Sequence, residues 1–299
     1  MIKRPMKAPT EPITDEQLQL IKYPVYGSAK LDGFRATVED KVYTSSMKPL
    51  PNLYVQNCLS TGDYNGLDGE LIVGPYNDPN AFNNTTGPLR RRDGEPDFTF
   101  FVFDDFTHPA FTYATRWLMA NDFSLPRAVT LEQRPLYTPQ EVIDFEIECL
   151  TRGFEGAMIR SPNAPYKEGR ATFREQYIFK RKPTEDAEGI VIDFEEQMEN
   201  CNEATTNEMG LTRRASNKEN LKPKGTLGKF ILKSDKWVET FGCGTGRGLT
   251  NELRQEIWNN KEKYLGKVVT FKYQPYGSID KPRLPIYKGF RAPEDITEY

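Results

Sequence analysis

Three charged residues lie close together in the stretch Ser28–Arg35, which reads SAKLDGFR. Alternate side chains of an extended strand share a face, so Lys30 and Asp32 are expected to point the same way. Gly33 lets the backbone turn at once, which brings Arg35 back toward the same pocket. A lysine amine held there can act as a nucleophile when it is neutral, although the spacing alone also fits a salt-bridged strand residue.

Five further motifs follow this stretch in a fixed order. They are LDGEL at 67–71, FVFDDF at 101–106, EGAMIR at 155–160, FKRKPTEDAEG at 179–189 and PRLPIYKGFR at 282–291. The series resembles the collinear signature of the covalent nucleotidyltransferases, which include ATP-dependent DNA ligases, RNA ligases and mRNA capping enzymes. Within this superfamily it is most similar to the minimal virus-encoded ATP-dependent DNA ligases, over nearly the whole chain.

The resemblance implies the chemistry of the reacting groups. Lys30 corresponds to the nucleophile that attacks the α-phosphate of ATP, forming lysyl-AMP and releasing pyrophosphate. Lys180 and Lys182 correspond to two lysines that grip the α-phosphate, and such neighbouring cations favour a neutral amine. Asp32 and Glu155 correspond to carboxylates near the metal, for which hard oxygen ligands and a triphosphate favour Mg²⁺. Phosphoryl transfer depends on positioning and charge neutralisation, which suits a site of this composition.

Besides Lys180 and Lys182, five further side chains are implied to bind the nucleotide. Ser28 corresponds to the residue that recognises the adenine amino group, and Glu70 to the one that contacts the ribose hydroxyls. Phe103 matches the aromatic that stacks on adenine, although a core role among the neighbouring phenylalanines is an alternative. Arg283 matches an arginine that orients the departing pyrophosphate, which would require the second domain to close over ATP. Arg35 is expected to reach both the nucleotide and DNA.

DNA must be bound by locally concentrated positive charge. The candidate DNA-binding residues are Arg35, Lys48, Arg170, Arg174, Arg213, Arg214 and Lys218. The last three lie in a polar insertion, expected as a long loop at about 198–225, that resembles the flexible latch of minimal viral ligases. Binding through such residues should be phosphate-led and sensitive to salt. A solubilising loop is the alternative.

One position departs from the family pattern. Relatives commonly carry an arginine that binds the nick phosphate in a segment resembling TSSMKPLPN at 44–52, where this chain has Ser45. Recognition of the 5'-phosphate is then expected to rest on Lys48, Arg35 or Arg170.

Composition limits the other possibilities. Of the 299 residues, 37% are hydrophobic and 12% aromatic, the formal net charge is −3 and the pI is near 5.6, which excludes a wholly basic surface. No apolar run approaches the roughly 18 to 20 residues of a membrane span, and the first residues do not read as a secretory signal. Four widely spaced cysteines indicate reduced thiols, and the single histidine, His108, excludes His-based triads. We expect a cytoplasmic monomer that does not contact membranes.

The elements needed to position these residues divide at about residue 185. One helix is predicted to begin after the capping residue Thr14 and to end before Pro24, and a second is predicted to begin after Thr138. A third helix is predicted over 251–264. The predicted strands cover 25–31, 67–74, 98–106, 156–162, 176–182, 188–195, 228–235, 236–242 and 267–274. The resemblance implies an α+β fold: a nucleotidyltransferase (ATP-grasp-like adenylation) domain of antiparallel sheets with helices at 1–185, followed by an OB-fold β-barrel at 186–299. A hinge is expected near 183–188.

The predicted function is ATP-dependent sealing of 3'-OH/5'-phosphate nicks in duplex DNA, as in replication, repair and recombination. RNA ligases and GTP-using capping enzymes are alternatives. The complete barrel with its 282–291 tail argues against the first, and Leu31, where capping enzymes usually have threonine, argues against the second. A non-catalytic DNA clamp would not need Lys30, Glu155 and the two late lysines. The compact chain favours a virus, a bacteriophage or a bacterial accessory enzyme as its source.

Overall fold

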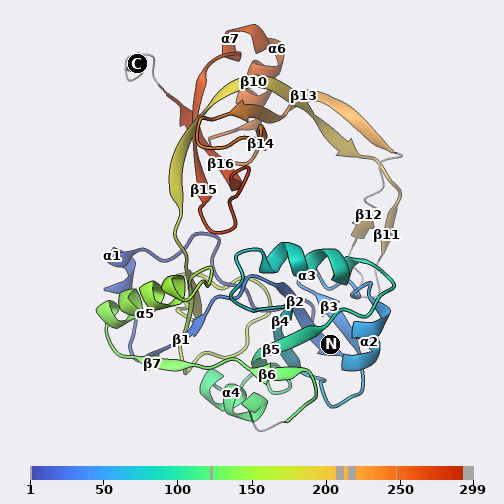
Figure 1. The fold of residues 1–299 in the computed structure, drawn as a ribbon, viewed down its shortest axis with the longest axis vertical. Coiled ribbons are helices and arrows are strands. Elements are labelled where there is room, and N and C mark those ends of the chain that lie inside the picture. Colours follow the sequence, from blue (N-terminus) through green and yellow to red (C-terminus); the bar gives the residue numbers. More distant parts are fainter. Residues whose placement is uncertain (1, 122–123, 207–211, 215–219, 247, 292–299) are drawn as a thin grey trace. The chain divides into compact units, whose positions relative to one another are not determined.

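The chain forms two compact units, Met1–Lys182 and Pro183–Tyr299, in a computed structural model (Figure 1). The structure describes residues 2–121, 124–206, 212–214, 220–246 and 248–291. The division lies three residues before the boundary predicted at 185/186. The described residues of the first unit form two hydrophobic core clusters, and those of the second unit form a third. None of the helices within the described ranges is long and apolar enough to cross a bilayer.

In its described residues the first unit contains two sheets and five helices. The four-stranded sheet has the order β7 (Arg134–Leu136), β1 (Val25–Ala29), β8 (Ala157–Arg160) and β9 (Ile178–Arg181). The five-stranded sheet has the order β3 (Lys41–Thr44), β2 (Phe34–Glu39), β4 (Leu67–Val73), β5 (Phe98–Asp105) and β6 (Ala128–Thr130). The helices are α1 (Asp15–Leu18), α2 (Leu53–Leu59), α3 (Ala81–Arg90), α4 (Tyr113–Asn121) and α5 (Pro139–Thr151). All neighbouring strands are antiparallel except β5 and β6.

Capping residues begin two of these helices as the sequence predicts. Thr14 and Gln17 form the predicted capping box of α1, but the helix is a single turn and ends well before Pro24. The Thr138 hydroxyl accepts a hydrogen bond from the Glu141 amide at the start of α5. Helix α5 packs on the four-stranded sheet so closely that a Cβ at Gly27 would lie 2.9 Å from the Phe145 ring.

The second unit is a five-stranded barrel. Its sheet has the order β14 (Phe241–Cys243), β13 (Leu221–Lys233), β10 (Glu185–Asn200), β15 (Val268–Gln274) and β16 (Arg283–Phe290). The two edges meet where Thr245 bridges to Ile286 and the Tyr287 amide donates to the Thr245 carbonyl at 2.7 Å. The predicted helix at 251–264 is divided at Asn260 into α6 (Asn251–Asn259) and α7 (Lys261–Tyr264). Most of the strand predicted at 236–242 is wrong, because only Phe241 and Gly242 of it lie in β14.

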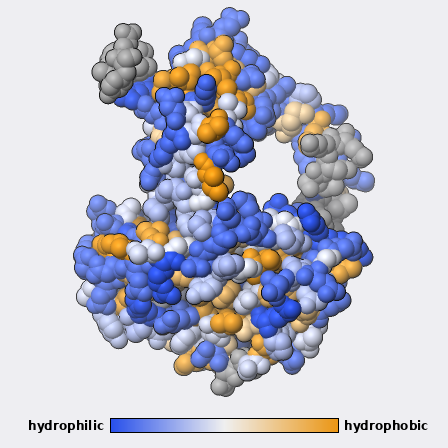
Figure 2. All heavy atoms as spheres, viewed as in Figure 1, coloured by the Kyte–Doolittle hydropathy of each residue, from blue (hydrophilic) through white to orange (hydrophobic). Residues whose placement is uncertain are grey.

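The described residues of the polar insertion mostly form a β-ribbon, so for them the expected long loop is wrong. Strands β10 and β13 remain paired as far as Asn200 and Leu221. Beyond them β11 (Ala204–Thr206) pairs with β12 (Thr212–Arg214). Lys218 lies outside the described residues. On the face drawn in Figure 2 the surface is mainly hydrophilic, with hydrophobic side chains in small scattered groups.

Candidate nucleotide-binding site

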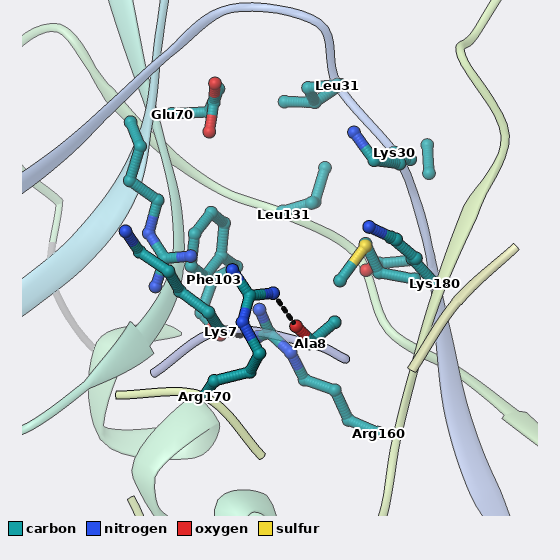
Figure 3. Close-up of a pocket in the computed structure, with 14 residues that line it drawn as sticks. Lys7, Ala8, Lys30, Leu31, Glu70, Phe103, Leu131, Arg160, Arg170 and Lys180 are labelled. Atoms are coloured by element: carbon teal, nitrogen blue, oxygen red, sulfur yellow. Dashed lines mark hydrogen bonds between the residues drawn. The ribbon is translucent and has the colours of Figure 1, made fainter. Parts of the chain in front are cut away.

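A pocket of about 220 Å³ lies in the first unit and is lined by residues from both of its sheets (Figure 3). The four-stranded sheet contributes Ser28, Met158 and Lys180, which are cross-strand neighbours on β1, β8 and β9. The five-stranded sheet contributes Arg35, Glu70 and Phe103. Lys30 and Leu31, which follow β1 directly, complete this part of the wall.

Lys30 is fixed by the EG pair that begins the EGAMIR motif. Its amide donates to the Gly156 carbonyl at 2.8 Å, and the Glu155 amide donates to the Lys30 carbonyl at 3.2 Å. The Lys30 ammonium donates to Glu155 Oε2, while Lys182 Nζ donates to Glu155 Oε1 at 3.1 Å. Glu155 is only 4% exposed. One buried carboxylate therefore holds two of the predicted catalytic lysines.

Glycine is required beside this carboxylate. Gly156 has a φ of +147°, and a Cβ there would lie 2.1 Å from the Arg181 carbonyl oxygen. The chain bends at Gly33 between β1 and β2, as predicted, although this glycine does not adopt a positive φ. A Cβ at Gly33 would lie 2.4 Å from the Leu71 carbonyl oxygen, so the glycine permits close approach to β4.

Successive side chains of β9 point to opposite sides of the strand, so Lys180 and Arg181 have different surroundings. Lys180 lines the pocket, and burial, together with the charges of Lys182 and Lys30, lowers its pKa to about 8. Arg181 points to the other side, where its Nε donates to Glu146 at 2.8 Å and its Nη1 to Asp15 at 2.8 Å. Lys182 follows the end of β9 rather than lying within it, yet still reaches the site.

Arg35 and Asp68 form a tether inside the five-stranded sheet. Arg35 Nε and Nη2 donate to the two Asp68 oxygens at 2.8 and 2.6 Å, and Nη2 also donates to the Met6 carbonyl at 2.9 Å. The Tyr166 hydroxyl donates to the same carboxylate at 2.7 Å. The predicted nucleotide and DNA ligand Arg35 is thus already neutralised and oriented by its own fold.

Glu70 lies opposite Arg35 on β4 and also lines the pocket. Burial raises its pKa to about 8; Lys30 and Arg35 oppose this effect, while Glu155 and Asp32 add to it. The carboxyl of the free protein is therefore mostly protonated at neutral pH.

Phe103 is placed where β4 and β5 change register. Asp68 pairs with Asp104 and Gly69 pairs with Val102, so Phe103 has no partner on β4. Its ring is 8% exposed, and the guanidinium carbons of Arg160 and Arg35 lie 4.6 and 4.9 Å from the ring centre. These are cation–π distances, so the ring already contacts two guanidinium groups of the protein. Stacking of adenine on this ring stays a prediction.

Asp32 and Glu155 provide oxygen donors of the kind that Mg²⁺ prefers. Asp32 is 5% exposed, and both carboxylates belong to the charge cluster that raises the pKa of Glu70. The described residues contain no group of three or more His, Cys, Asp or Glu placed to hold a metal ion. The donor set fits an ion whose remaining ligands come from phosphate oxygens and water.

The other predicted site residues are dispersed. Arg170 lines the pocket, whereas Lys48 is exposed on the turn after β3. Arg174 is exposed at a separate pocket of the first unit. Arg213 and Arg214 lie on β12, where Arg214 donates to the Asn202 carbonyl, and Arg283 begins β16.

Sequence reasoning missed Lys7 and Arg160. Both line the pocket, and Arg160 Nη1 donates to the Phe103 carbonyl at 2.9 Å. Arg160 stands within the EGAMIR motif, so its alternation with Met158 along β8 could have found it. Lys7 belongs to none of the motifs, and local patterns do not predict its position.

Comparison with known proteins finds a family model that matches part of the second unit. Residues 220–291 match the model of the DNA ligase OB-like domain. The DNA ligase of African swine fever virus (isolate Warthog/Namibia/Wart80/1980) is 26% identical over 135 residues, which are 43% of this chain and 31% of that protein. The chain thus spans about a third of the length of the curated relatives that it matches.

Solved structures show the same fold along the chain. The Chlorella virus DNA ligase–adenylate is 26% identical, with a TM-score of 0.53 over 99% of this chain and 100% of that one. A structure from a structure–function study of Lig E DNA ligases is 21% identical, with a TM-score of 0.66 over 90% of this chain and 93% of that one. The predicted α+β architecture with an OB domain is confirmed, and so is the resemblance to the minimal virus-type ligases.

Proposed function

We propose that this chain, which shares its fold and its OB-like domain with the minimal virus-type ATP-dependent DNA ligases, seals 3'-OH/5'-phosphate nicks in duplex DNA. ATP donates the AMP group, and the reaction passes through lysyl-AMP and an adenylylated 5' end. We further propose that it acts as a cytoplasmic monomer in DNA replication, repair or recombination.

The observation that carries this proposal is the arrangement of Lys30, Glu155 and Lys182. A single buried carboxylate accepts hydrogen bonds from both ammonium groups. An ammonium group cannot attack phosphorus, so the proton of Lys30 must leave first. Glu155, which already accepts a hydrogen bond from the Lys30 ammonium, would accept that proton, and the hydrogen bond between the Lys30 amide and the Gly156 carbonyl would hold the Lys30 backbone beside it.

The first step forms the bond between Lys30 Nζ and the α-phosphorus and breaks the bond between the α- and β-phosphates, so pyrophosphate leaves. Lys180 and Lys182 would hold the α-phosphate, and Arg283 of the second unit would orient the pyrophosphate. Ser28 and Phe103 would bind adenine, and Glu70 the ribose hydroxyls. Mg²⁺, held by Asp32 and Glu155, would neutralise phosphate charge when bound.

The next two steps act on DNA. A 5'-phosphate oxygen attacks the phosphorus of lysyl-AMP and releases Lys30, and the 3'-hydroxyl then attacks the 5'-phosphorus and releases AMP. The phosphodiester bond is thereby formed and the protein returns to its starting state. Duplex DNA would be bound chiefly through its phosphates by the basic residues of both units.

A sealing assay tests this proposal. A nicked duplex with one labelled 5'-phosphate strand is incubated with the protein, Mg²⁺ and either ATP, GTP or NAD, and a nicked RNA duplex serves as the comparison substrate. We expect joined DNA strands with ATP only. Joining that requires GTP or an RNA duplex would instead indicate another covalent nucleotidyltransferase, and DNA binding without joining would indicate a clamp.

A further inference from the structure

The N-terminal segment is joined to the segment that carries Arg170. Lys7 and Arg170 form a parallel β-bridge, in which the Lys7 amide donates to Gly169 and the Ala171 amide donates to Lys7, each at 2.8 Å. Arg170 Nη1 also donates to the Ala8 carbonyl at 2.7 Å. Two cations that are far apart in the sequence are therefore held together at the pocket wall (Figure 3).

Lys7 and Arg170 differ from several neighbouring cations of the site in that no carboxylate of the described residues neutralises them. Within the described part of the chain neither side chain pairs with a carboxylate, whereas Lys30 and Lys182 share Glu155 and Arg35 is paired with Asp68. Burial lowers the pKa of Lys7, and the charges of Arg35, Arg170 and Arg4 lower it further. An uncompensated pair of this kind at the wall of a pocket is suited to a phosphate group.

The Lys7 ammonium also lies at the position where the family pattern is broken. Lys7 Nζ donates to the backbone carbonyl of Ser45 at 2.8 Å. By its resemblance to the minimal viral ligases, Ser45 corresponds to a position where an arginine is common, and Lys7 brings a positive charge to that turn from a different segment. Ser45 itself is exposed and carries no charge.

We propose that Lys7, together with Arg170, binds the 5'-phosphate of the nick and compensates for the missing arginine at position 45. This inference rests on the function proposed above. The α-phosphate of ATP has Lys180 and Lys182 next to Lys30, so the Lys7 and Arg170 pair is available for a second phosphate. A terminal phosphate carries about two negative charges at neutral pH, which two cations can match.

The test separates the two possible sources of that phosphate, the nick and the triphosphate of ATP. Lysyl-AMP is first formed with labelled ATP, and its formation rate is recorded. The pre-formed, purified lysyl-AMP protein is then mixed with increasing concentrations of nicked DNA, and the discharge of label is followed. Binding of a nick with a 5'-hydroxyl, which cannot react, is measured in parallel.

We expect Lys7→Ala to form lysyl-AMP at a rate within about twofold of the wild type. Its half-saturating concentration of 5'-phosphate nick should rise by roughly tenfold or more, because a charge-assisted hydrogen bond is removed. Binding of the 5'-hydroxyl nick should be unchanged. Lys7→Arg should behave as the wild type, and adding Ser45→Arg to Lys7→Ala should restore nick affinity, since it returns a charge to the same turn.

Lys41→Ala, which removes an exposed lysine from β3, is the matched control and should change none of these quantities. Equal thermal unfolding of Lys7→Ala and the wild type excludes a loss of fold. Unchanged discharge by Lys7→Ala would overturn the inference, and so would slow formation of lysyl-AMP with normal discharge, because the phosphate would then be that of ATP. If the wild type forms no lysyl-AMP, or no nick discharges it, the proposed function itself fails.

Discussion

At the scale of residues, the candidate site is a set of charges that hold one another in the free protein. Lys30 and Lys182 share Glu155, and Arg35 is tethered to Asp68. The sequence predicts cations around Lys30, and the structure adds a carboxylate in direct contact with it. When phosphate binds, these cations would exchange a carboxylate of the protein for a phosphate oxygen without first having to be brought together. The cost of reorganisation is therefore low.

Glu70 should impose a pH dependence on stability. Its pKa in the folded protein is about 8, above the ordinary 4.5, so the folded protein binds this proton more tightly than the unfolded chain does. The stabilising contribution is complete below pH 4.5 and is lost as the pH rises to 8. The free energy of unfolding of the wild type, measured with urea, should therefore fall relative to that of Glu70→Gln across this range. If the free energies of unfolding of the two proteins change in parallel with pH, the raised pKa of Glu70 is refuted.

At the scale of elements, helix α4 is anchored to β5 by a buried ion pair that the sequence did not indicate. Arg116 is 0% exposed, and its Nε and Nη2 donate to the Asp104 oxygens at 2.8 and 3.2 Å. Its Nη1 donates to the Ala164 carbonyl at 2.9 Å, which ties in the segment after β8. The pair lies directly after Phe103 and thereby fixes the end of β5 at the site.

Arg116→Met should destabilise the first unit by about 3–5 kcal/mol, because it leaves the Asp104 carboxylate buried without its partner. Urea unfolding gives this quantity directly. Arg152→Met, which breaks the exposed pair with Glu148 on α5, is the comparison and should cost less than about 1 kcal/mol. Adding Asp104→Asn to Arg116→Met should recover part of the stability. Equal stability of the two single variants would contradict the anchoring role.

The β-ribbon formed by β10 to β13 can be shortened without disturbing the barrel. The Cys201 amide donates to the Asn220 carbonyl at 2.9 Å, so replacing residues 203–219 by a two-residue turn keeps that link intact. We expect the shortened protein to bind nicked DNA more weakly and to form lysyl-AMP at an unchanged rate. The slope of the logarithm of the DNA-binding constant against the logarithm of the salt concentration should become shallower by about 0.9 for each DNA phosphate that the ribbon no longer binds. Nick affinity equal to that of the intact chain would make the insertion a solubilising segment.

The elements that the sequence predicts well are those with strong local signals. Thr14, Thr138 and the aromatic or branched runs of β1, β4, β5 and β8 act through neighbours along the chain. Helices α2, α3 and α4 are not among the predicted helices, although two of them carry capping signals: the Asn52 side chain accepts a hydrogen bond from the Val55 amide, and the Thr112 hydroxyl accepts one from the Thr115 amide. The insertion reads as a loop because its strands gain stability only by pairing.

The same distinction explains which site residues could be found. The motif residues are recognisable from their order along the chain. The bridge between Lys7 and Arg170 joins distant segments, so no local periodicity of the sequence predicts it.

At the scale of the whole molecule, the proposed first step needs residues from both units. Lys30 belongs to the first unit and Arg283 to the second, and the chain passes between them at Lys182 and Pro183. Because the net charge is −3, the proposed DNA binding would depend on local groups of cations rather than on overall attraction. The junction would have to allow the second unit to close over ATP and then to reopen so that DNA can enter.

Arg283→Ala should separate the steps. If this arginine acts only on pyrophosphate, lysyl-AMP formation should fall by about two orders of magnitude, as when one electrostatic donor to a transition state is removed. Sealing of a nick that already carries 5'-adenylate should change by no more than a few-fold. Lys281→Ala, which removes the lysine paired with Glu239 just before β16, is the control for loss of nearby positive charge. An equal decrease in both steps would place Arg283 in DNA binding or in the fold.

The central claim, that Lys30 is the nucleophile, is tested most directly by covalent labelling. The wild type and Lys30→Ala are incubated with Mg²⁺ and ATP labelled at the α-phosphate, separated on a denaturing gel, and compared before and after addition of nicked duplex DNA. We expect label on the wild type alone, and we expect it to be discharged as the nick is sealed. Label on Lys30→Ala, or none on either protein, would contradict the central claim.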